Sequence, residues 1–599
     1  MIGLIREIYS LFTPGQKRGF WWLQLLVVMM AIFELLSIAI IFPFIAIVSD
    51  PALISENPLI NQLYSYFYFE SYNDFLLLLA FFVLFFLTTA SLVSVFTTWR
   101  LAMFASKVGV DVADSLFKHY LSQGWLFHAR RSSSNLTKNI ATESIRYSDF
   151  VIQPLMQVNA KIVLVLLISV SITIYNPIVA LSAIGLFLTV YLVLYYFVRV
   201  KLQENGEMLS KYNGDRFNLM SQSFGGVKDV ILLGTKSFFI DKFTYAGNKF
   251  AHARGVNAGL SQVPRYLIEL IAFGSIILLI IYLLFDNDNK IELILPILSV
   301  YAFAGLKLLP AIQQVYVNLS QIKGNISAFD EIKTDLILAS KNKDNNAFFD
   351  INKKCMKVKS NIQVDNVSFS YEEGQPVLDG LDLEIKANQV VGIVGNSGSG
   401  KSTIIDLILG LITPQEGSIT IDGCVINENN LREWQNSIGF VPQSIFLTEG
   451  SISQNIAFGI PDDLIDVDQV IRSVELAHLT DLIEKMPKGL DTKVGERGVQ
   501  LSGGQRQRIA IARALYFGAD ILVFDEATSA LDGITEKMIM DAVHDFHGSK
   551  TIVMVAHRLK TVKKCDIIYF IDNGKVSDKG SYDELVQKNE KFRRMASHS

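Results

Sequence analysis

The sequence predicts an α-helical membrane domain of six spans followed by a soluble α/β domain. Long apolar runs fill the chain up to about residue 320, whereas the rest alternates short strand-like and helix-like segments with turn residues between them. Half of the 599 residues are apolar, only 19% are charged, and the mean hydropathy is +0.33, which is too high for an ordinary soluble chain. This composition also excludes a disordered or fibrous protein.

Charge and cysteine content narrow the function further. The net charge is −4, so no overall basic excess points to a nucleic-acid partner. The three cysteines, Cys355, Cys424 and Cys565, have neither zinc-site nor disulfide spacing. We therefore expect them to be packing thiols in a reducing compartment.

Six apolar segments are long enough to cross a membrane, since the hydrocarbon core needs about 20 residues of helix. They are residues 20–48, 75–99, 151–175, 178–198, 266–285 and 293–317. The first follows an amphipathic stretch and has no small-residue cleavage site, so we expect it to be a retained span and not a signal peptide.

Lys and Arg are distributed unevenly among the loops. The loops at residues 100–150 and 199–265 hold seven and ten of them, whereas the three loops on the other side hold only Lys290. Because basic residues accumulate on the cytoplasmic side, we expect both termini and both long loops in the cytoplasm. The helical periodicity of these loops predicts that the second to fifth spans continue as helices beyond the membrane, as does the last span.

A phosphate-binding loop lies in the soluble half. The β-branched strand at residues 390–394 leads into a glycine-rich turn and then a helix, which is the context that this motif requires. Glycines let backbone N–H groups surround a β-phosphate, Lys401 bridges the β- and γ-phosphates, and the Ser402 hydroxyl binds Mg²⁺. The predicted nucleotide-binding residues here are Gly395, Asn396, Ser397, Gly398, Ser399, Gly400, Lys401, Ser402 and Thr403.

Acidic residues follow another apolar strand, at residues 521–524. The strand presents Asp525 and Glu526 at its carboxyl end, where α/β sheets bind ligands. We expect Asp525 to hold Mg²⁺, directly or through water, and Glu526 to act as general base toward the attacking water. The apolar strand at 551–556 ends at His557, which is well placed to contact a γ-phosphate.

A second anion-binding helix end lies between these elements. Ser502, Gly503, Gly504 and Gln505 directly precede or begin a helical segment, so that a serine caps a glycine-rich N-terminus. One nucleotide cannot easily use both helix ends. We therefore predict a head-to-tail dimer in which this end meets the phosphates held by the other copy.

Together these motifs resemble the nucleotide-binding domain of an ATP-binding cassette (ABC) transporter. The similar features are LSGGQ at 501–505, the phosphate loop, ILVFDE at 521–526, Gln443 in FVPQ, SALD at 529–532, and His557. The resemblance implies that Tyr371 stacks on adenine and that Gln443 senses Mg²⁺ and couples to the membrane part. It also implies that Ser502 and Gly504 clamp the partner's ATP, that Asp532 crosses the dimer interface and that Glu496 touches the partner.

Six spans ahead of one cassette resemble a half-size exporter of the type IV fold, which works as a dimer with ATP and Mg²⁺. We expect a membrane domain with an N-terminal elbow helix at 1–336, a polar linker at 337–361 and a nucleotide-binding domain at 362–599. The family's coupling helices would fall near residues 125–131 and 217–225.

Three features bear on the substrate. The outer segment 55–71 is rich in tyrosine and phenylalanine and predicts either an interfacial helix or an aromatic plug. Arg265 and Lys307 lie in or beside apolar spans, where an unpaired charge is costly. We expect each cation to face a polar cavity or a partner. The alternatives are that the side chains snorkel to the membrane surface or that Arg265 pairs with Glu269, one helical turn away. The runs at 33–50 and 263–270 resemble bacterial flippases of lipid-linked oligosaccharides, and this resemblance implies that both cations handle a lipid diphosphate.

The leading functional hypothesis is therefore an ATP-driven flippase for a polyprenyl-diphosphate oligosaccharide in the bacterial inner membrane. Its partners would be membrane lipid, the lipid-linked glycan and a second copy of itself. Two alternatives stay open. One is an exporter of another amphiphile, such as a lipid A precursor or a drug, and the other is a peptide exporter.

Overall fold

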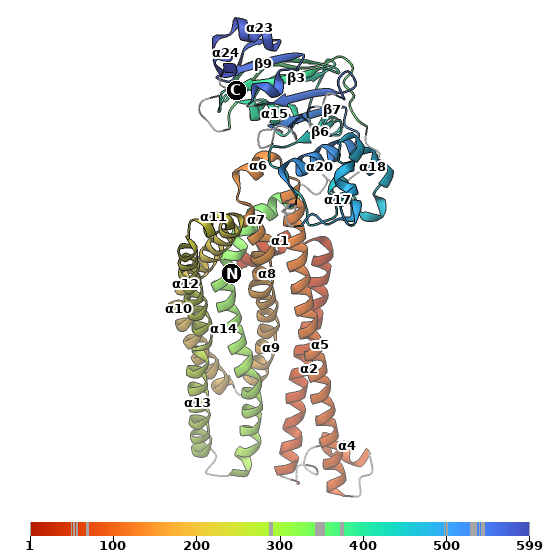
Figure 1. Ribbon diagram of the computed structural model, residues 1–599. Helices are drawn as coiled ribbons and strands as arrows, with labels where there is room; N and C mark the ends of the chain where they lie inside the picture. The colour runs from red at the N-terminus through yellow and green to blue at the C-terminus, as the bar shows by residue number, and fades with distance from the viewer. Residues whose placement is uncertain are drawn as a thin grey trace. The chain divides into compact units, whose positions relative to one another are not determined.

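The computed structural model describes most of the chain in two compact units. The described residues are 2–49, 51, 54, 58–66, 71–175, 177–286, 291–341, 354–371, 376–495, 498, 501–526, 536–537, 540, 545–556 and 558–597. One unit comprises Met1–Gln123 and Phe127–Asn346, and the other Gly124–Leu126 and Ala347–Ser599. The first is helical and the second contains all of the described strands (Figure 1).

Six long helices of the first unit contain the predicted spans, except that the first two residues of the span at 151–175 belong to the preceding π-helical turn. Among the described residues, four segments are long and apolar enough to cross a membrane: Pro14–Val48, Tyr72–Leu121, Ser133–Ile174 and Ala180–Gly225. The long helices are α2 (Pro14–Ser49), α5 (Tyr72–Leu121), α9 (Gln153–Tyr175), α10 (Pro177–Gly225), α13 (Pro264–Asp286) and α14 (Ile291–Lys341).

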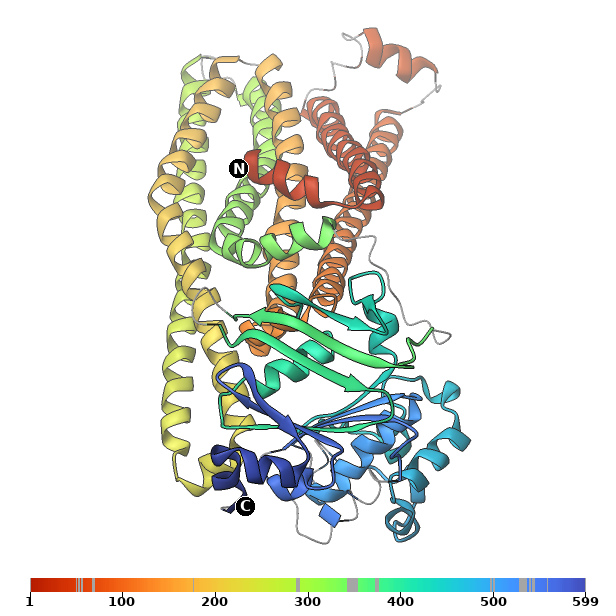
Figure 2. The same cartoon turned by 90° about the horizontal axis from the view of Figure 1, so that it is seen from above.

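The two long loops are helical, as predicted. Helices α5 and α10 each continue well beyond their apolar segment, and α12 (Lys236–Gln262) returns alongside α10 (Figure 2). Short elements complete this unit: α1 (Ile2–Leu11), α4 (Pro58–Tyr66), α7 (Ser133–Lys138), α8 (Ser144–Tyr147), α11 (Val227–Leu232), and the π-helical turns Asn139–Glu143 and Ser148–Ile152. Helix α6 (Trp125–Arg130) begins in the short segment assigned to the second unit and ends in the first.

One of the two expected coupling-helix positions is wrong. The first coincides with α6, but residues 217–225 are the last turns of α10, and the short helix of this loop is α11 (Val227–Leu232). The long helix persists to Gly225, and Gly226 then breaks it by taking a non-helical conformation as the N-cap of α11. The break therefore comes where two glycines adjoin, because glycine disfavours the helix interior.

Helices α10 and α14 approach each other closely at two glycines. A Cβ on Gly206 would lie 2.7 Å from the carbonyl oxygen of Gly324. Asn257 of α12 donates hydrogen bonds to the carbonyls of Leu202 and Gly324, both at 3.4 Å, and accepts one from Asn205 at 3.0 Å. The absence of side chains at the two glycines thus permits a three-helix contact that buried amides hold together.

A largely buried arginine adds to the same junction. Arg146 pairs with Glu143 at 3.1 Å and donates to Ser210 of α10 at 2.8 Å and to Ser327 of α14 at 3.1 Å. An unpaired charge would be costly in this interior. The partners of Arg146 therefore favour one specific arrangement of the helices at this junction.

The second unit is built on two sheets. The larger has the order β10-β9-β3-β8-β7-β6, with β9, β3, β8, β7 and β6 parallel, and the smaller, antiparallel one has the order β2-β1-β4-β5. The strands are β1 (Asn361–Phe369), β2 (Leu378–Lys386), β3 (Val390–Gly395), β4 (Glu416–Ile421), β5 (Cys424–Val425), β6 (Ile438–Val441), β7 (Ile521–Asp525), β8 (Thr551–Val555), β9 (Ile567–Asp572) and β10 (Lys575–Gly580). Continuous burial of β3 and β8 explains their uninterrupted apolar sequences.

Helices surround the parallel sheet, and two hydrophobic clusters form the core of this unit. The helices are α15 (Lys401–Ile408), α16 (Leu431–Gln435), α17 (Ile452–Ile456), α18 (Val467–Leu476), α19 (Thr480–Glu484), α20 (Gly503–Tyr516), α22 (Leu559–Val562), α23 (Tyr582–Lys588) and α24 (Glu590–Ser597), with 3₁₀ turns at Asp462–Leu464 and Gly489–Asp491. Cys565 is buried in this core, and the other two cysteines are exposed.

Asp422 fastens the start of β1 to the turn after β4. Its carboxylate accepts hydrogen bonds from the backbone N–H groups of Lys359, Ser360 and Asn361 at 2.8, 2.8 and 2.9 Å. Burial alone would raise the pKa of Asp422, but the three donors together outweigh it and lower the pKa below its ordinary value.

We predict that Asp422→Asn removes part of the acid sensitivity of the second unit. A carboxyl with a lowered pKa stabilises the folded state above its unfolded pKa of about 3.9, and this contribution is lost as the pH falls through the folded pKa. In thermal unfolding between pH 3 and 7, the melting temperature of wild type should exceed that of the variant at neutral pH, and the difference should vanish toward pH 3. A constant difference over this range would contradict the charge-based role.

We also predict that Gly206→Ala destabilises the first unit by about 1–3 kcal/mol, because the new methyl group would overlap a backbone carbonyl that no rotamer change can move. Gly185→Ala is the matched control, since it lies on the same helix and its added Cβ would meet no atom within 4 Å. Thermal unfolding in nanodiscs should separate the two variants. Equal melting temperatures would show that α10 and α14 do not depend on this contact.

Candidate functional site

The predicted nucleotide site forms at the carboxyl ends of the parallel strands. Val441 of β6 is in register with Phe524 of β7, and Asp525 is in register with Val555 of β8. The residues that follow these strands therefore meet at one edge of the sheet. Gln443, two residues after β6, donates a hydrogen bond of 2.7 Å from Nε2 to Glu526 Oε2.

The phosphate loop requires glycine at both of its ends. A Cβ on Gly395 would lie 2.2 Å from the carbonyl oxygen of Ile571, so no side chain fits where β3 passes β9. Gly400 has a φ of 100°, and a Cβ there would lie 2.7 Å from Leu378 Cδ2. Gly400 is also the N-cap of α15, so the loop turns directly into the helix N-terminus, as the motif predicts.

Lys401 lies under this loop. Its Nζ donates to the carbonyls of Gly395 and Asn396 at 2.9 and 2.8 Å. Burial lowers the pKa of Lys401, and Glu526 and Asp525 oppose that effect. The lysine and the two carboxylates are therefore close enough to interact electrostatically.

Glu526 has an unusual backbone conformation. Its φ is +48°, in the left-handed region that non-glycine residues seldom adopt, and its N–H donates to the carbonyl of Val555 at 3.0 Å. Such strain costs about 1–3 kcal/mol and collects at functional sites. The strand end thus holds this carboxylate in one direction toward Gln443.

The residues proposed for Mg²⁺ have suitable chemistry. Ser402, Gln443 and Asp525 offer hydroxyl, amide and carboxylate oxygens, which are the hard ligands that Mg²⁺ prefers alongside water and phosphate. Ser402 is exposed in the first turn of α15, and Asp525 ends β7 beside Lys401. Such a set suits an ion that is shared with a nucleotide.

Two further contacts occur on the helix side of the loop. The hydroxyls of Tyr371 and Thr403 are 3.2 Å apart, and the Tyr371 ring packs edge-on against Phe369.

A further carboxylate, Asp406, lies on helix α15. Its pKa is raised to about 6, mainly by burial and also by the negative charge of the nearby Asp525. Sequence analysis missed Asp406; its position one turn after Ser402, on the same helix face, was the available signal.

The second anion-binding helix end has the expected cap. Ser502 caps α20 in a reciprocal box: its Oγ accepts from Gln505 N at 3.3 Å, and Gln505 Oε1 accepts from Ser502 N at 2.9 Å. Gly503 is exposed and Gly504 is buried. Within the described residues, no hydrogen bond or ion pair joins Ser502–Gln505 to the phosphate loop. Some predicted residues lie outside the described residues, namely Glu496, His557 and the whole of SALD at 529–532, including Asp532.

Arg265 and Lys307, the two cations proposed to contact the substrate, are both paired. Arg265 Nε is 2.7 Å from Glu269 Oε1, one turn along α13. This is the pairing that the sequence offers as an alternative to a free cation. Lys307 Nζ of α14 is 3.8 Å from Glu34 Oε2 of α2. Glu34 is buried, and its other oxygen accepts a hydrogen bond of 2.8 Å from Ser94 of α5.

The outer aromatic segment is helical over α4. Tyr64 packs edge-on against Phe75 of α5, with ring centroids 5.2 Å apart. Residues 55–57 and 67–70 of the predicted segment lie outside the described residues. Its placement at the membrane surface stays a prediction.

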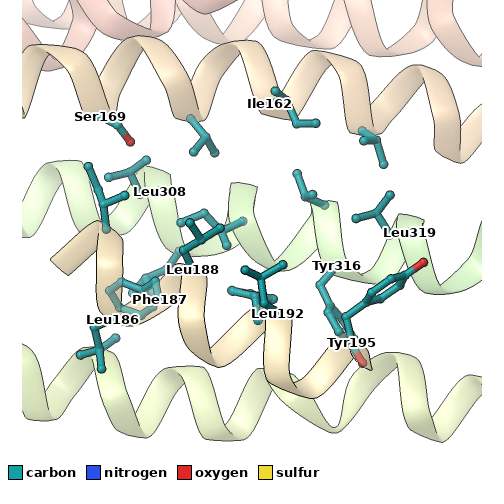
Figure 3. Close-up of a pocket in the computed structure, with 18 of the residues that line it drawn as sticks. Ile162, Ser169, Leu186, Phe187, Leu188, Leu192, Tyr195, Leu308, Tyr316 and Leu319 are labelled. Carbon is teal, nitrogen blue, oxygen red and sulfur yellow. The ribbon is translucent and has the colours of Figure 1, made fainter. Parts of the chain in front are cut away.

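A large apolar cavity lies between α9, α10 and α14, with α13 and α1 contributing to its wall. Its volume is about 1610 Å³. Figure 3 shows Ile162 from α9, Leu192 from α10, and Leu308 and Leu319 from α14 directed into the same space. The charged residues lining it are Arg199 and Lys323, and neither Arg265 nor Lys307 is among the lining residues. Sequence analysis treated Arg199 only as a loop charge.

Comparison with known proteins covers both units. The family described as the ABC transporter transmembrane region matches residues 36–305, and the family described as ABC transporter matches residues 378–529. Three similar proteins are ATP-dependent lipid A-core flippases. That of Shewanella denitrificans is 29% identical over 87% of this chain and 86% of its own length, and that of Vibrio vulnificus 29% over 92% and 93%. That of Cupriavidus pinatubonensis is 40% identical over 39% of this chain and 40% of its own length.

A solved structure has the same overall fold. The structure of a bacterial Atm1-family ABC exporter with ATP bound matches with a TM-score of 0.77 and 23% identity, over 96% of this chain and 97% of that one. The helical membrane unit and the α/β ATPase unit therefore share the fold of that exporter. The chain belongs to the ABC transporters: it is an ATP-driven exporter with a multi-pass membrane domain fused to an ABC ATPase domain that couples ATP hydrolysis to transport.

Proposed function

We propose that this exporter moves a polyprenyl-diphosphate-linked oligosaccharide across the bacterial cytoplasmic membrane. The cavity between α9, α10 and α14 is the main support, because a volume of about 1610 Å³ with an almost wholly apolar lining suits a long hydrocarbon tail. The sequence runs at 33–50 and 263–270 add the resemblance to flippases of lipid-linked oligosaccharides. The cytoplasmic placement of both termini and the domain limits 1–336, 337–361 and 362–599 belong to the same proposal.

A second candidate is a lipid of the lipid A-core type. The specific observation is the name shared by the similar proteins, two of which match this chain over most of its length. The two lipids have the same general chemistry, an anionic phosphate group beside long apolar tails. The cavity suits either tail, and the attached sugars distinguish them.

The energy for transport comes from the ATPase domain, for which we propose the following roles. Ser402, Gln443 and Asp525 would hold Mg²⁺, which supplies charge neutralisation to the phosphates when bound. Lys401 and the backbone of residues 395–403 bind the β- and γ-phosphates, and Tyr371 stacks on adenine. Glu526 takes a proton from the attacking water, held in place by Gln443, and His557 contacts the γ-phosphate.

The second helix end completes the site in the dimer. Ser502, Gly503, Gly504 and Gln505 contact the ATP bound to the partner, and Asp532 lies at the interface between the two ATPase domains. The exposed cap of α20 supports this role, since its backbone N–H groups and helix dipole favour an anion. Each ATP would therefore lie between two copies of the chain.

We predict that Glu526→Gln keeps ATP binding and lowers turnover by about 10²–10⁴-fold, because glutamine keeps the shape of the side chain and loses the base. Lys401→Ala should instead weaken ATP binding. Equilibrium binding of ATP and steady-state hydrolysis, measured on both variants in nanodiscs, separate the two effects. Near wild-type hydrolysis by Glu526→Gln would refute its role as base.

The substrate proposal makes Arg265 and Lys307 contacts of the lipid diphosphate, and the observed ion pairs supply matched controls. Arg265→Gln and Lys307→Gln should lower flipping of a labelled lipid-linked oligosaccharide in proteoliposomes by about tenfold, since each removes a charge that binds phosphate. Glu269→Gln and Glu34→Gln break the same ion pairs and keep the cations, so flipping should persist.

Basal ATP hydrolysis should be retained in all four variants, because none of these residues lies in the nucleotide site. Equal losses of flipping in both members of each pair would show that the pairs act only structurally. Flipping of lipid A and not of the oligosaccharide would favour the second candidate.

A further inference from the structure

The cavity extends along α10 and α14 to the level of the contact between Gly206 and Gly324. There α10 and α14 lie at backbone distance, as the 2.7 Å approach to the Gly324 carbonyl shows. The lining residues include Gln203 on α10 and Ile326 on α14, which flank this contact. The glycine contact therefore determines how far apart the side chains at this end are held.

Polar groups collect at this end. Arg199 and Gln203 are four residues apart on α10, so they share one face of the helix, and Lys323 directly precedes Gly324 on α14. Tyr191, which has a buried hydroxyl without a hydrogen bond to any described residue, lies more than two turns farther toward the apolar part. The end of a mostly apolar cavity thus holds two cations and an amide.

The two cations are available to a ligand. Neither Arg199 nor Lys323 forms an ion pair with a described residue, unlike Arg265 and Lys307. The Arg199 guanidinium lies 4.9 Å from the centroid of the Tyr196 ring, a stacking contact that leaves its N–H groups free to donate. The residues that line the cavity include no aspartate or glutamate among those that the structure describes.

The level of these groups along the helices suits a lipid head group. Arg199 directly follows the apolar segment 178–198, and Lys323 lies about six residues beyond the segment 293–317, which is roughly 9 Å of helix. The rest of the cavity extends back into the apolar segments, past Leu192 and Ile162 (Figure 3). A ligand with its charge at this end would place its tail in hydrocarbon surroundings.

We infer that Arg199, Gln203 and Lys323 form a binding site for the phosphate group of the transported lipid, at the cytoplasmic end of the cavity. This inference rests on the proposed function, in which the substrate is a lipid that carries a phosphate or diphosphate. Arg199 donates to two phosphate oxygens, Lys323 supplies a second positive charge, and Gln203 donates from the side. The site is separate from the paired cations Arg265 and Lys307, and it receives the lipid on the side from which transport starts.

The test measures equilibrium binding of undecaprenyl diphosphate to the full-length protein in nanodiscs. The double variant Arg199→Gln, Lys323→Gln should bind this lipid about tenfold more weakly than wild type. Undecaprenol, which has the same tail and no phosphate, should bind wild type and variant equally. Inorganic phosphate, which has no tail, should not displace the lipid at equal concentration. Lys201→Gln is the matched control, because Lys201 lies on the same helix, pairs with Glu204 at 3.2 Å and does not line the cavity.

Thermal unfolding and basal ATP hydrolysis establish that the double variant is folded, and the single variant Arg199→Lys should recover part of the binding. Unchanged affinity of the double variant for undecaprenyl diphosphate would overturn the inference, as would equal weakening of undecaprenol binding or displacement by inorganic phosphate. The flipping assay is independent of this outcome. If the double variant binds undecaprenyl diphosphate as wild type does and still flips the oligosaccharide lipid, the phosphate site is refuted and the proposed function stands. If the double variant loses binding but wild type does not flip the oligosaccharide lipid, the phosphate site stands and the proposed function is refuted.

Discussion

Hydrocarbon offers no hydrogen-bond partner, and this constraint explains most features of the membrane unit. Every backbone group in a span must be satisfied within its own helix, so the apolar segments become the uninterrupted helices α2, α5, α9, α10, α13 and α14. The same constraint applies to side chains. Arg265 pairs with Glu269 along one helix, and Lys307 pairs with Glu34 across two. Arg199 and Lys323, which line the cavity and form no ion pair with a described residue, lie just beyond the apolar segments 178–198 and 293–317.

Close packing at glycines shapes the membrane unit in a complementary way. The contact of Gly206 with Gly324 brings α10 and α14 together at one level, and the helices leave room for a cavity on the apolar side of it. Arg146 and Asn257 supply the buried hydrogen bonds that hold the junction. One small contact therefore sets the spacing of α10 and α14 beside the polar groups at this end of the cavity.

The ATPase unit, in contrast, must bind a highly charged ligand. Parallel strands end at one edge of the sheet, and the phosphate loop, the acidic pair after β7 and Gln443 after β6 all lie there. Glycine at positions 395 and 400 removes the atoms that would block the loop. The left-handed conformation of Glu526 aims a carboxylate at Gln443. Binding and hydrolysis thus depend on backbone geometry as much as on side-chain identity.

Local patterns in the sequence were sufficient for much of this protein. Apolar runs predict all six spans because a bilayer imposes a length, and the phosphate loop predicts its own strand, turn and helix because glycine spacing is a local property. Contacts between distant segments were decided only in three dimensions. Four features join residues that are far apart in the chain or placed by helix packing. They are the pairing of Lys307 with Glu34, the hydrogen bond between Gln443 and Glu526, the raised pKa of Asp406 near Asp525, and the cavity with Arg199 and Lys323. The end of α10 was also decided in three dimensions, since the helix continues through 217–225, where the family resemblance placed a coupling helix, and breaks only at Gly226.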